Sequence, residues 1–317
     1  GTTYRPDSAS SGYVTTYGIE NNGTITADGN TITLLGSWDN NAVFNKDAST
    51  VVFAATSSTM SIDSTGASLA TFNHVTFGTA ATAATWTLTT PLDVDGNLTI
   101  NFGTLSPAST AITIAGNLTI GANGIFAKGS ATTTFDGAST ATWTDNTVAK
   151  QDMGSVAIDG TTKTVQLGAA AKATNITIGS DDTFSAGSSY AIEVIGNWLN
   201  NNSFVAQSGT VTFSATSTGK SITPGSSAFY NVTFNGANGN WAFTSGVSVG
   251  NDFTIATGTV NLPSATTTIT GSFLNTGGAF QHNNGAVVFN ASAAGKTVTP
   301  GTSSFYDLTF SGTGSWS

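Results

Sequence analysis

The residues that could do chemistry in this chain are few and widely separated. Among its 317 residues are two histidines, His74 and His282, and no cysteine, which excludes disulfides, thiolate metal sites and cysteine nucleophiles. Neither histidine has a serine, cysteine or carboxylate placed with it as a catalytic triad requires. No zinc-protease, Walker or Rossmann motif occurs. We interpret His74 as a solvent-facing strand residue.

Carboxylates offer the second kind of chemistry. The segment Asp-Val-Asp-Gly-Asn at 93–97 looks like part of a calcium loop, but it lacks the remaining ligands and the distal glutamate, so we predict a turn. Asp181 and Asp182 form a loop pair that could hold a cation weakly. Glycoside hydrolysis needs two carboxylates in one cleft, and Glu20 and Glu193 are the only glutamates. We predict no enzyme activity and no catalytic, cofactor-binding or metal-binding residue.

The composition restricts the partners. Charged residues make up 8% of the chain, with a formal net charge of −9, against about 25% charged residues in ordinary soluble domains. Arg5 is the one arginine and the lysines are scattered, so no basic cluster could follow a phosphate backbone. No apolar run approaches the roughly 18 residues of a membrane span. We therefore expect neither a nucleic-acid partner nor membrane insertion of this segment.

A long internal repeat dominates the sequence. Val-Thr-Phe at 211–213, Gly-Lys-Ser-Ile-Thr-Pro-Gly at 219–225 and Phe-Tyr-Asn-Val-Thr-Phe at 229–234 recur in similar form 76 residues later. Weaker copies lie nearer the N-terminus, and an equivalent marker begins at Gly36, Gly116, Gly196 and Gly271. Periods of this length indicate a solenoid or an array of domains.

Each module divides into shorter units of about 20 residues. Val-Thr-Phe, Leu-Thr-Ile and Phe-Thr-Ile alternate apolar and hydroxyl residues, as strands do, and Gly, Asn, Ser and Asp separate them. The unit therefore predicts an all-β, parallel and right-handed β-solenoid of about 16 coils, with a four-coil higher-order repeat of 76–80 residues. A tandem array of immunoglobulin-like sandwiches is the alternative. We expect residues 18–317 to form a single continuous solenoid domain and residues 1–17 an N-terminal cap or docking segment.

The repeat also predicts the core. One column of inward side chains is expected at Phe53, Phe77, Phe135, Ile158, Phe213, Phe234, Phe289 and Phe310. A second column is expected at Trp38, Leu98, Leu118, Trp198, Phe253 and Phe273, and structural roles at Trp86, Leu167, Trp241 and Trp316. Asn97, Asn117, Asn197 and Asn251 lie beside turn glycines, where stacked amides can bond along the axis, so a short Asn ladder is predicted.

The Gly-Asn-[Leu/Trp/Phe] and Val-Thr-Phe rhythm, from about Gly18 to Trp316, resembles large Thr/Gly/Asn-rich bacterial surface β-helix proteins, such as adhesin and autotransporter-passenger stalks. This resemblance implies export and an extracellular or cell-surface location. It implies no ligand.

We therefore expect a structural, non-catalytic surface or fibre segment that acts as a rigid stalk. Its expected partners are adjoining repeats or further copies of the same protein. One alternative is an adhesin that binds surface carbohydrate through exposed aromatics, for which Tyr13, Tyr17 and Tyr190 are the candidates. The second alternative is a β-helical polysaccharide-degrading enzyme.

Overall fold

The structure is a computed structural model that describes residues 3–4, 13–65, 71–80 and 84–317. The chain forms two compact units, Gly1–Val165 and Gln166–Ser317, here called unit 1 and unit 2. The described residues contain no helix and form a β-solenoid of about 14 turns, with roughly 20 residues per turn. The described residues therefore include no helical segment that could cross a membrane. The predicted fold class is confirmed.

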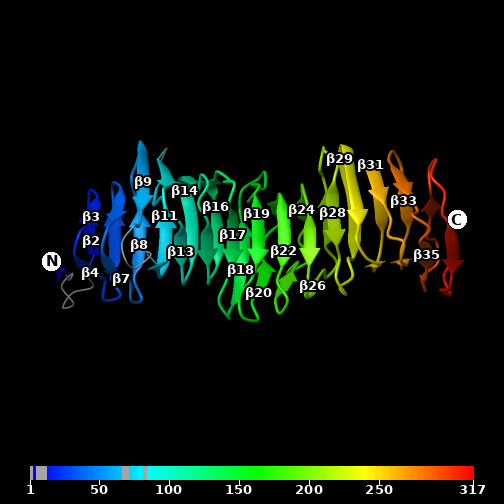
Figure 1. Cartoon of the computed structure of the whole chain (residues 1–317), viewed down its shortest axis with the longest axis horizontal. Helices are drawn as coiled ribbons and strands as arrows, with labels where there is room; N and C mark the ends of the chain where they lie inside the picture. The colour runs from blue at the N-terminus through cyan, green and yellow to red at the C-terminus, as the bar shows by residue number, and fades with distance from the viewer. Residues whose placement is uncertain (1–2, 5–12, 66–70, 81–83) are drawn as a thin grey trace. The chain divides into compact units, whose positions relative to one another are not determined.

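Parallel ladders build unit 1, and successive strands lie side by side along it (Figure 1). The first ladder is β2 (Tyr13–Thr16), β5 (Thr31–Leu34), β8 (Thr50–Phe53), β11 (His74–Phe77), β14 (Leu98–Ser106), β16 (Leu118–Phe126) and β18 (Thr140–Asp145). The second is β3 (Ile19–Asn21), β6 (Trp38–Asn40), β9 (Thr59–Asp63) and β12 (Thr85–Leu88), which joins β14. The others are β10 (Thr71–Phe72), β13 (Leu92–Val94), β15 (Ile112–Ile114), β17 (Thr132–Phe135) and β19 (Ser155–Ile158), and β1 (Thr3–Tyr4), β4 (Thr24–Thr26) and β7 (Val43–Asn45).

Unit 2 is built in the same way, after β20 (Thr164–Leu167). Its longest ladder is β21 (Ala171–Ala173), β24 (Ile192–Val194), β27 (Thr210–Phe213), β29 (Asn231–Phe243), β31 (Phe253–Asn261), β33 (Phe273–Asn275) and β36 (Val298–Thr299). A second is β22 (Asn175–Ile178), β25 (Trp198–Asn200) and β28 (Lys220–Thr223), which joins β29. The remaining strands are β23 (Thr183–Ser185) with β26 (Ser203–Val205), β34 (Ala279–Gln281) on β31, and β30 (Val247–Val249), β32 (Thr267–Ile269), β35 (Ala286–Phe289) and β37 (Asp307–Phe310).

The strand pairings within each unit are parallel, which rules out the immunoglobulin-like sandwich, whose sheets are antiparallel. The number of coils is about 14, fewer than the 16 predicted, because many coils are longer than the average marker spacing. Val51, for example, pairs with Val75, and Leu118 pairs with Trp143. Extra residues between strands lengthen the coil without changing the ladder.

A described strand lies within the segment predicted to be an N-terminal cap or docking segment. Tyr13–Thr16 already forms a strand in register with Thr31–Leu34, so the first ladder begins within the segment expected to be a separate cap. Residues 1–2 and 5–12 lie outside the described residues. The continuity of residues 18–317 as a single domain stays a prediction.

The 76-residue sequence repeat does not contain a whole number of coils. Val211 pairs with Val232, Val232 with Phe253 and Phe253 with Phe273, which completes three coils along one ladder. Val287, the repeat partner of Val211, lies two strands beyond β33, in a ladder with Thr267 and Leu308. One sequence copy therefore spans three coils and part of a fourth, not the four predicted. Each copy in unit 2 begins on a different face of the solenoid.

This mismatch also corrects the predicted core. The two expected columns lie side by side on the same strands and take in other residues, because Leu98 pairs with Val75 whereas Phe77 pairs with Ile100. The side chains themselves are inward as predicted: Phe53, Trp86, Leu118, Trp198, Phe234 and Phe273 are all buried. Phe310 is the exception, with half of its surface exposed. Stacked pairs such as Phe53 and Phe77, with ring centroids 4.9 Å apart, fill the interior.

Candidate functional site

A chain of side-chain acceptors runs along the axis at one corner of unit 1, and we call it the axial ladder. The Asn97 backbone N–H donates to His74 Nδ1 at 2.9 Å. The Asn117 N–H donates to Asn97 Oδ1 at 2.9 Å, and the Thr142 N–H donates to Asn117 Oδ1 at 2.7 Å. Each coil thus supplies an acceptor for a backbone donor of the next coil. His74 is a member of this ladder, which its sequence position did not predict.

Unit 2 repeats the axial ladder with other side chains. The Asn197 N–H donates to Asn175 Oδ1 at 2.8 Å, and the Ser221 N–H donates to Asn197 Oδ1 at 2.9 Å. The Asp252 N–H donates to Asn231 Oδ1 at 3.2 Å. The Ser272 N–H donates to Asp252 Oδ1 at 2.8 Å, and the Thr297 N–H donates to Ser272 Oγ at 3.1 Å. Asn251 also donates from Nδ2 to Asn231 Oδ1 at 2.9 Å. The predicted Asn ladder is therefore confirmed, but most of its donors are backbone groups rather than stacked amides.

The axial ladder explains the glycines of the repeat marker. A Cβ at Gly96 would lie 2.5 Å from His74 Nδ1, and one at Gly196 would lie 2.4 Å from Asn175 Oδ1. Neither distance is compatible with a methyl group. Glycine is required at these corners because the acceptor of the preceding coil occupies the space a side chain would take.

A second set of asparagines is buried inside the solenoid, and sequence reasoning missed it. Asn40, Asn200 and Asn275 follow the marker aromatic by two residues and are at most 3% exposed. Asn200 donates from Nδ2 to the Pro224 carbonyl at 2.9 Å and accepts the Asn202 N–H at 3.1 Å. The signal was the recurring [Trp/Phe]-x-Asn triplet, whose third residue shares the inward face of its strand. These residues secure a turn and are structural.

The carboxylates of the 93–97 segment are engaged in local interactions. Asp95 forms an ion pair with Lys46, and Asp93 accepts a hydrogen bond from Thr113 Oγ1 at 2.6 Å. Lys163 is fully buried and donates from Nζ to the Ala115 carbonyl. The turn predicted over 93–97 is limited to a bend at Asp95 and Gly96, because Asp93 belongs to β13.

Asp136 lies within electrostatic range of this cluster. Burial raises the pKa of its carboxyl above the usual range, the charges of Asp93 and Asp95 add to the rise, and Lys163 opposes it. Because the folded-state pKa is raised, this group favours folding at acidic pH and loses that contribution as the pH rises through the raised pKa.

The remaining sequence candidates do not come together. Asp182 is buried and Asp181 is exposed, so they do not form the exposed loop pair that was predicted. Within the part of the chain that the structure describes, no three His, Cys, Asp or Glu residues are placed to hold a metal ion. Tyr17 is 80% exposed, Tyr190 is half-buried, and the Tyr13 side chain lies outside the described residues.

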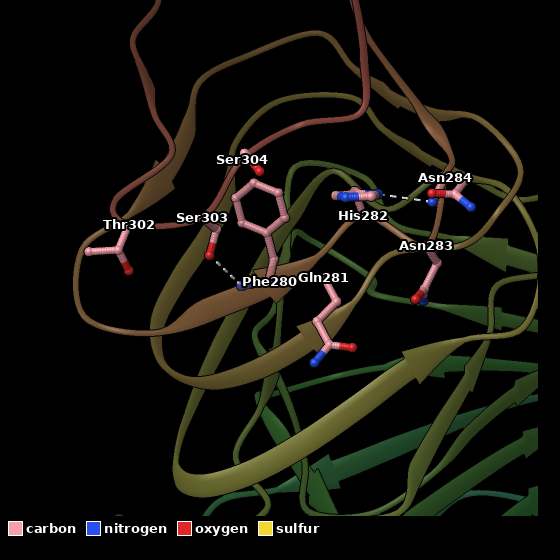
Figure 2. A pocket seen from close by; sticks show the side chains of 8 residues that line it. All are labelled: Phe280, Gln281, His282, Asn283, Asn284, Thr302, Ser303 and Ser304. Carbon is pink, nitrogen blue, oxygen red and sulfur yellow. Dashed lines mark hydrogen bonds between the residues drawn. The ribbon is translucent and has the colours of Figure 1, made fainter.

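A polar hollow of about 590 Å³ opens in unit 2, between the turn after β34 and the segment before β37. Figure 2 shows the hydroxyl residues on one side of the Phe280 ring and His282 with its neighbours on the other. The lining residues are Phe280, Gln281, His282, Asn283, Asn284, Thr302, Ser303 and Ser304. None of them carries a carboxylate, lysine or arginine side chain. We call this feature the His282 hollow.

Hydrogen bonds hold the backbone around the His282 hollow. The Phe280 N–H donates to Ser303 Oγ at 3.0 Å, and the Asn284 N–H donates to His282 Nδ1 at 3.0 Å (Figure 2). The His282 ring is stacked on Tyr306, with centroids 5.4 Å apart and planes inclined by 23°. Sequence reasoning did not select this place, because its residues come from two coils.

Comparisons with known proteins identify no relative. No family model, curated protein or solved structure matches the chain.

Proposed function

We propose that this chain is a structural, non-catalytic segment of an extracellular surface or fibre protein, a stiff stalk whose coils adjoin further coils of the same kind. The observation that carries the proposal is how a coil is buried. Phe234 and Val232 in β29 are fully buried beneath β31, to which β29 is hydrogen-bonded. Phe310 and Leu308, their repeat partners in β37, are 50% and 44% exposed.

The exposed surface of β37 has the chemistry of an interface between coils. In the described residues β37 pairs with β35 alone, so its other edge offers backbone donors and acceptors beside a row of apolar side chains. An open strand edge of this kind is a template for another strand. A further coil, from the same protein or from another copy, satisfies both the edge and the apolar row.

The low charge supports the same proposal. With 8% charged residues, successive coils stack with little repulsion between identical positions 4.8 Å apart. Thr, Ser and Asn keep the outer faces hydrated instead.

Inserting one further copy of residues 211–286 tests the stalk. We expect a folded chain whose maximum dimension in small-angle X-ray scattering grows by roughly 18 Å, the rise of between three and four coils. Loss of folding, or an unchanged length, would contradict a stalk made of interchangeable coils.

Location and self-association need separate measurements. Antibody labelling of intact source cells should reach the protein, whereas labelling only after permeabilisation would exclude a surface role. Electron microscopy of the purified chain should show end-to-end stacking that Phe310→Asp abolishes, because a charge then replaces the apolar side chain in the contact. Stacking that survives Phe310→Asp would place the contact elsewhere.

Adhesion is the second candidate function. The observation that favours it is the His282 hollow, where amide and hydroxyl side chains lie beside the stacked rings of His282 and Tyr306.

A further inference from the structure

The His282 hollow combines polar groups that the fold itself does not use. The side chains of Gln281, Asn284, Thr302 and Ser304 make no hydrogen bond within the described part of the chain and all four residues are exposed. Asn283 donates from Nδ2 to the Leu262 carbonyl at 2.8 Å, which fixes its amide and points to Oδ1 as a further acceptor. Amides and hydroxyls together provide donors and acceptors but no net charge.

An aromatic surface lies beside these groups. Tyr306 is 58% exposed although its ring is stacked on His282, so the pair presents a broad flat face to solvent. Pyranose rings have apolar C–H faces that pack on aromatic rings and hydroxyls that exchange hydrogen bonds with amides. A volume of about 590 Å³ lies within the usual range of small-molecule sites.

The first copy of the repeat provides an internal reference. The 76-residue offset aligns the eight lining residues with Phe204, Val205, Ala206, Gln207, Ser208, Ser226, Ser227 and Ala228. Two of the eight residues are identical, the phenylalanine and the serine that bond to one another, at 2.8 Å in the first copy and 3.0 Å in the second. The other six differ.

Half of these differences make the lining of the second copy more polar than that of the first. Val205, Ala206 and Ala228 correspond to Gln281, His282 and Ser304, so apolar side chains in one copy are hydrogen-bonding groups in the other. By contrast, Gly-Lys-Ser-Ile-Thr-Pro-Gly at 219–225 differs from its copy at 295–301 in two of seven residues, both of them conservative changes. The scaffold is kept, and the residues that line the hollow are changed.

We propose that the His282 hollow binds a neutral oligosaccharide, with the His282–Tyr306 pair packing against a sugar ring and Gln281, Asn284, Thr302 and Ser304 bonding its hydroxyls. This goes beyond the stalk function and does not depend on it. The absence of lysine, arginine and carboxylate side chains from the lining favours an uncharged sugar over a uronic acid.

The test is titration of the full chain with cellotetraose, maltotetraose and mannotetraose, followed by calorimetry and saturation-transfer NMR, with tetragalacturonate as the charged comparison. We expect at least one neutral sugar to bind more tightly than the uronic acid. The triple variant Gln281→Val/His282→Ala/Asn284→Ser places at these three positions the residues of the first copy, which the same scaffold tolerates. It should weaken binding roughly tenfold or more, because the bonds to the sugar are lost.

Two further variants separate binding from folding. Tyr306→Leu alters an exposed side chain and should weaken binding while leaving the melting temperature unchanged. Gln207→Asn makes in the first copy the turn residue found in the second, and should leave the affinity unchanged. The proposal is overturned if no neutral tetrasaccharide binds, if tetragalacturonate binds best, or if the triple variant binds as the wild type does.

Discussion

The two copies of the repeat in unit 2 share their strand and turn motifs but have different surroundings. In the first copy Phe234 is stacked on Phe213 at 5.3 Å and also contacts Phe253 of the following coil at 5.5 Å. In the second copy Phe310 is stacked on Phe289 at the same 5.3 Å, yet it is half exposed. The ring stacking is therefore the same in both copies, but only Phe234 is buried. A coil thus specifies its own strand and depends on its successor for much of its core.

The largest effect should separate Phe234 from Phe310. Phe234→Ala removes a ring enclosed on all sides and should lower the free energy of unfolding by about 3–5 kcal/mol. In a solution too dilute for end-to-end stacking, Phe310→Ala removes a half-exposed ring and should cost roughly half of that, because less apolar area is lost. Urea unfolding followed by tryptophan fluorescence measures both. Equal losses would show that the coil containing β37 is buried in solution by another molecule.

A second pair of variants should behave alike and so test whether the interiors of the two copies match. Asn200 and Asn275 each donate to a proline carbonyl at 2.9 Å and are both buried. Replacing either with alanine leaves that carbonyl and a turn N–H without a partner, at a cost of about 1–3 kcal/mol. Chemical denaturation should give the two variants similar losses. A much smaller loss for Asn275→Ala would mean that water enters the second copy.

The smallest effect concerns Asn231, where the second copy has Asp307. Asn231→Asp places a carboxylate at the acceptor position for the Asp252 N–H, close to a second acid, and should cost about 1 kcal/mol or less at neutral pH. The cost should shrink as the pH falls and the carboxylates are protonated. Melting temperatures at pH 7 and pH 3 test the sign.

The sequence was sufficient to predict which side chains point into the solenoid. It was not sufficient to predict how many coils one copy of the repeat spans. Period-2 alternation in strands such as Val-Thr-Phe determines which side chains point inward, and Phe53, Trp86 and Phe273 are buried as predicted. The number of strands in one sequence copy could not be counted from turn residues, because β29 runs through Asn231–Phe243 across Asn-Gly-Ala-Asn-Gly-Asn at 235–240. The pairing of β29 with β31 shifts register within this segment and then resumes, so the turn residues there do not mark the end of the strand.

The candidate site was less predictable for a related reason. Tyr17 and Tyr190 attracted attention because they break the repeat, whereas Tyr306 repeats Tyr230 and did not. What distinguishes Tyr306 is His282, which is 24 positions earlier in the chain and stacks on it from the preceding turn. Contacts between coils depend on the length of each coil, and that length varies with loops whose composition does not reveal it.

The fractional number of coils in each sequence copy has a consequence for any stalk built from many such copies. Corresponding residues of successive copies do not point in the same direction, because every copy starts on the next face, as Val211 and Val287 do. A group that recurs once per copy therefore takes a different angular position around the axis of the stalk in each successive copy. Gene duplication in units of this length would yield a filament that carries such a group on every face.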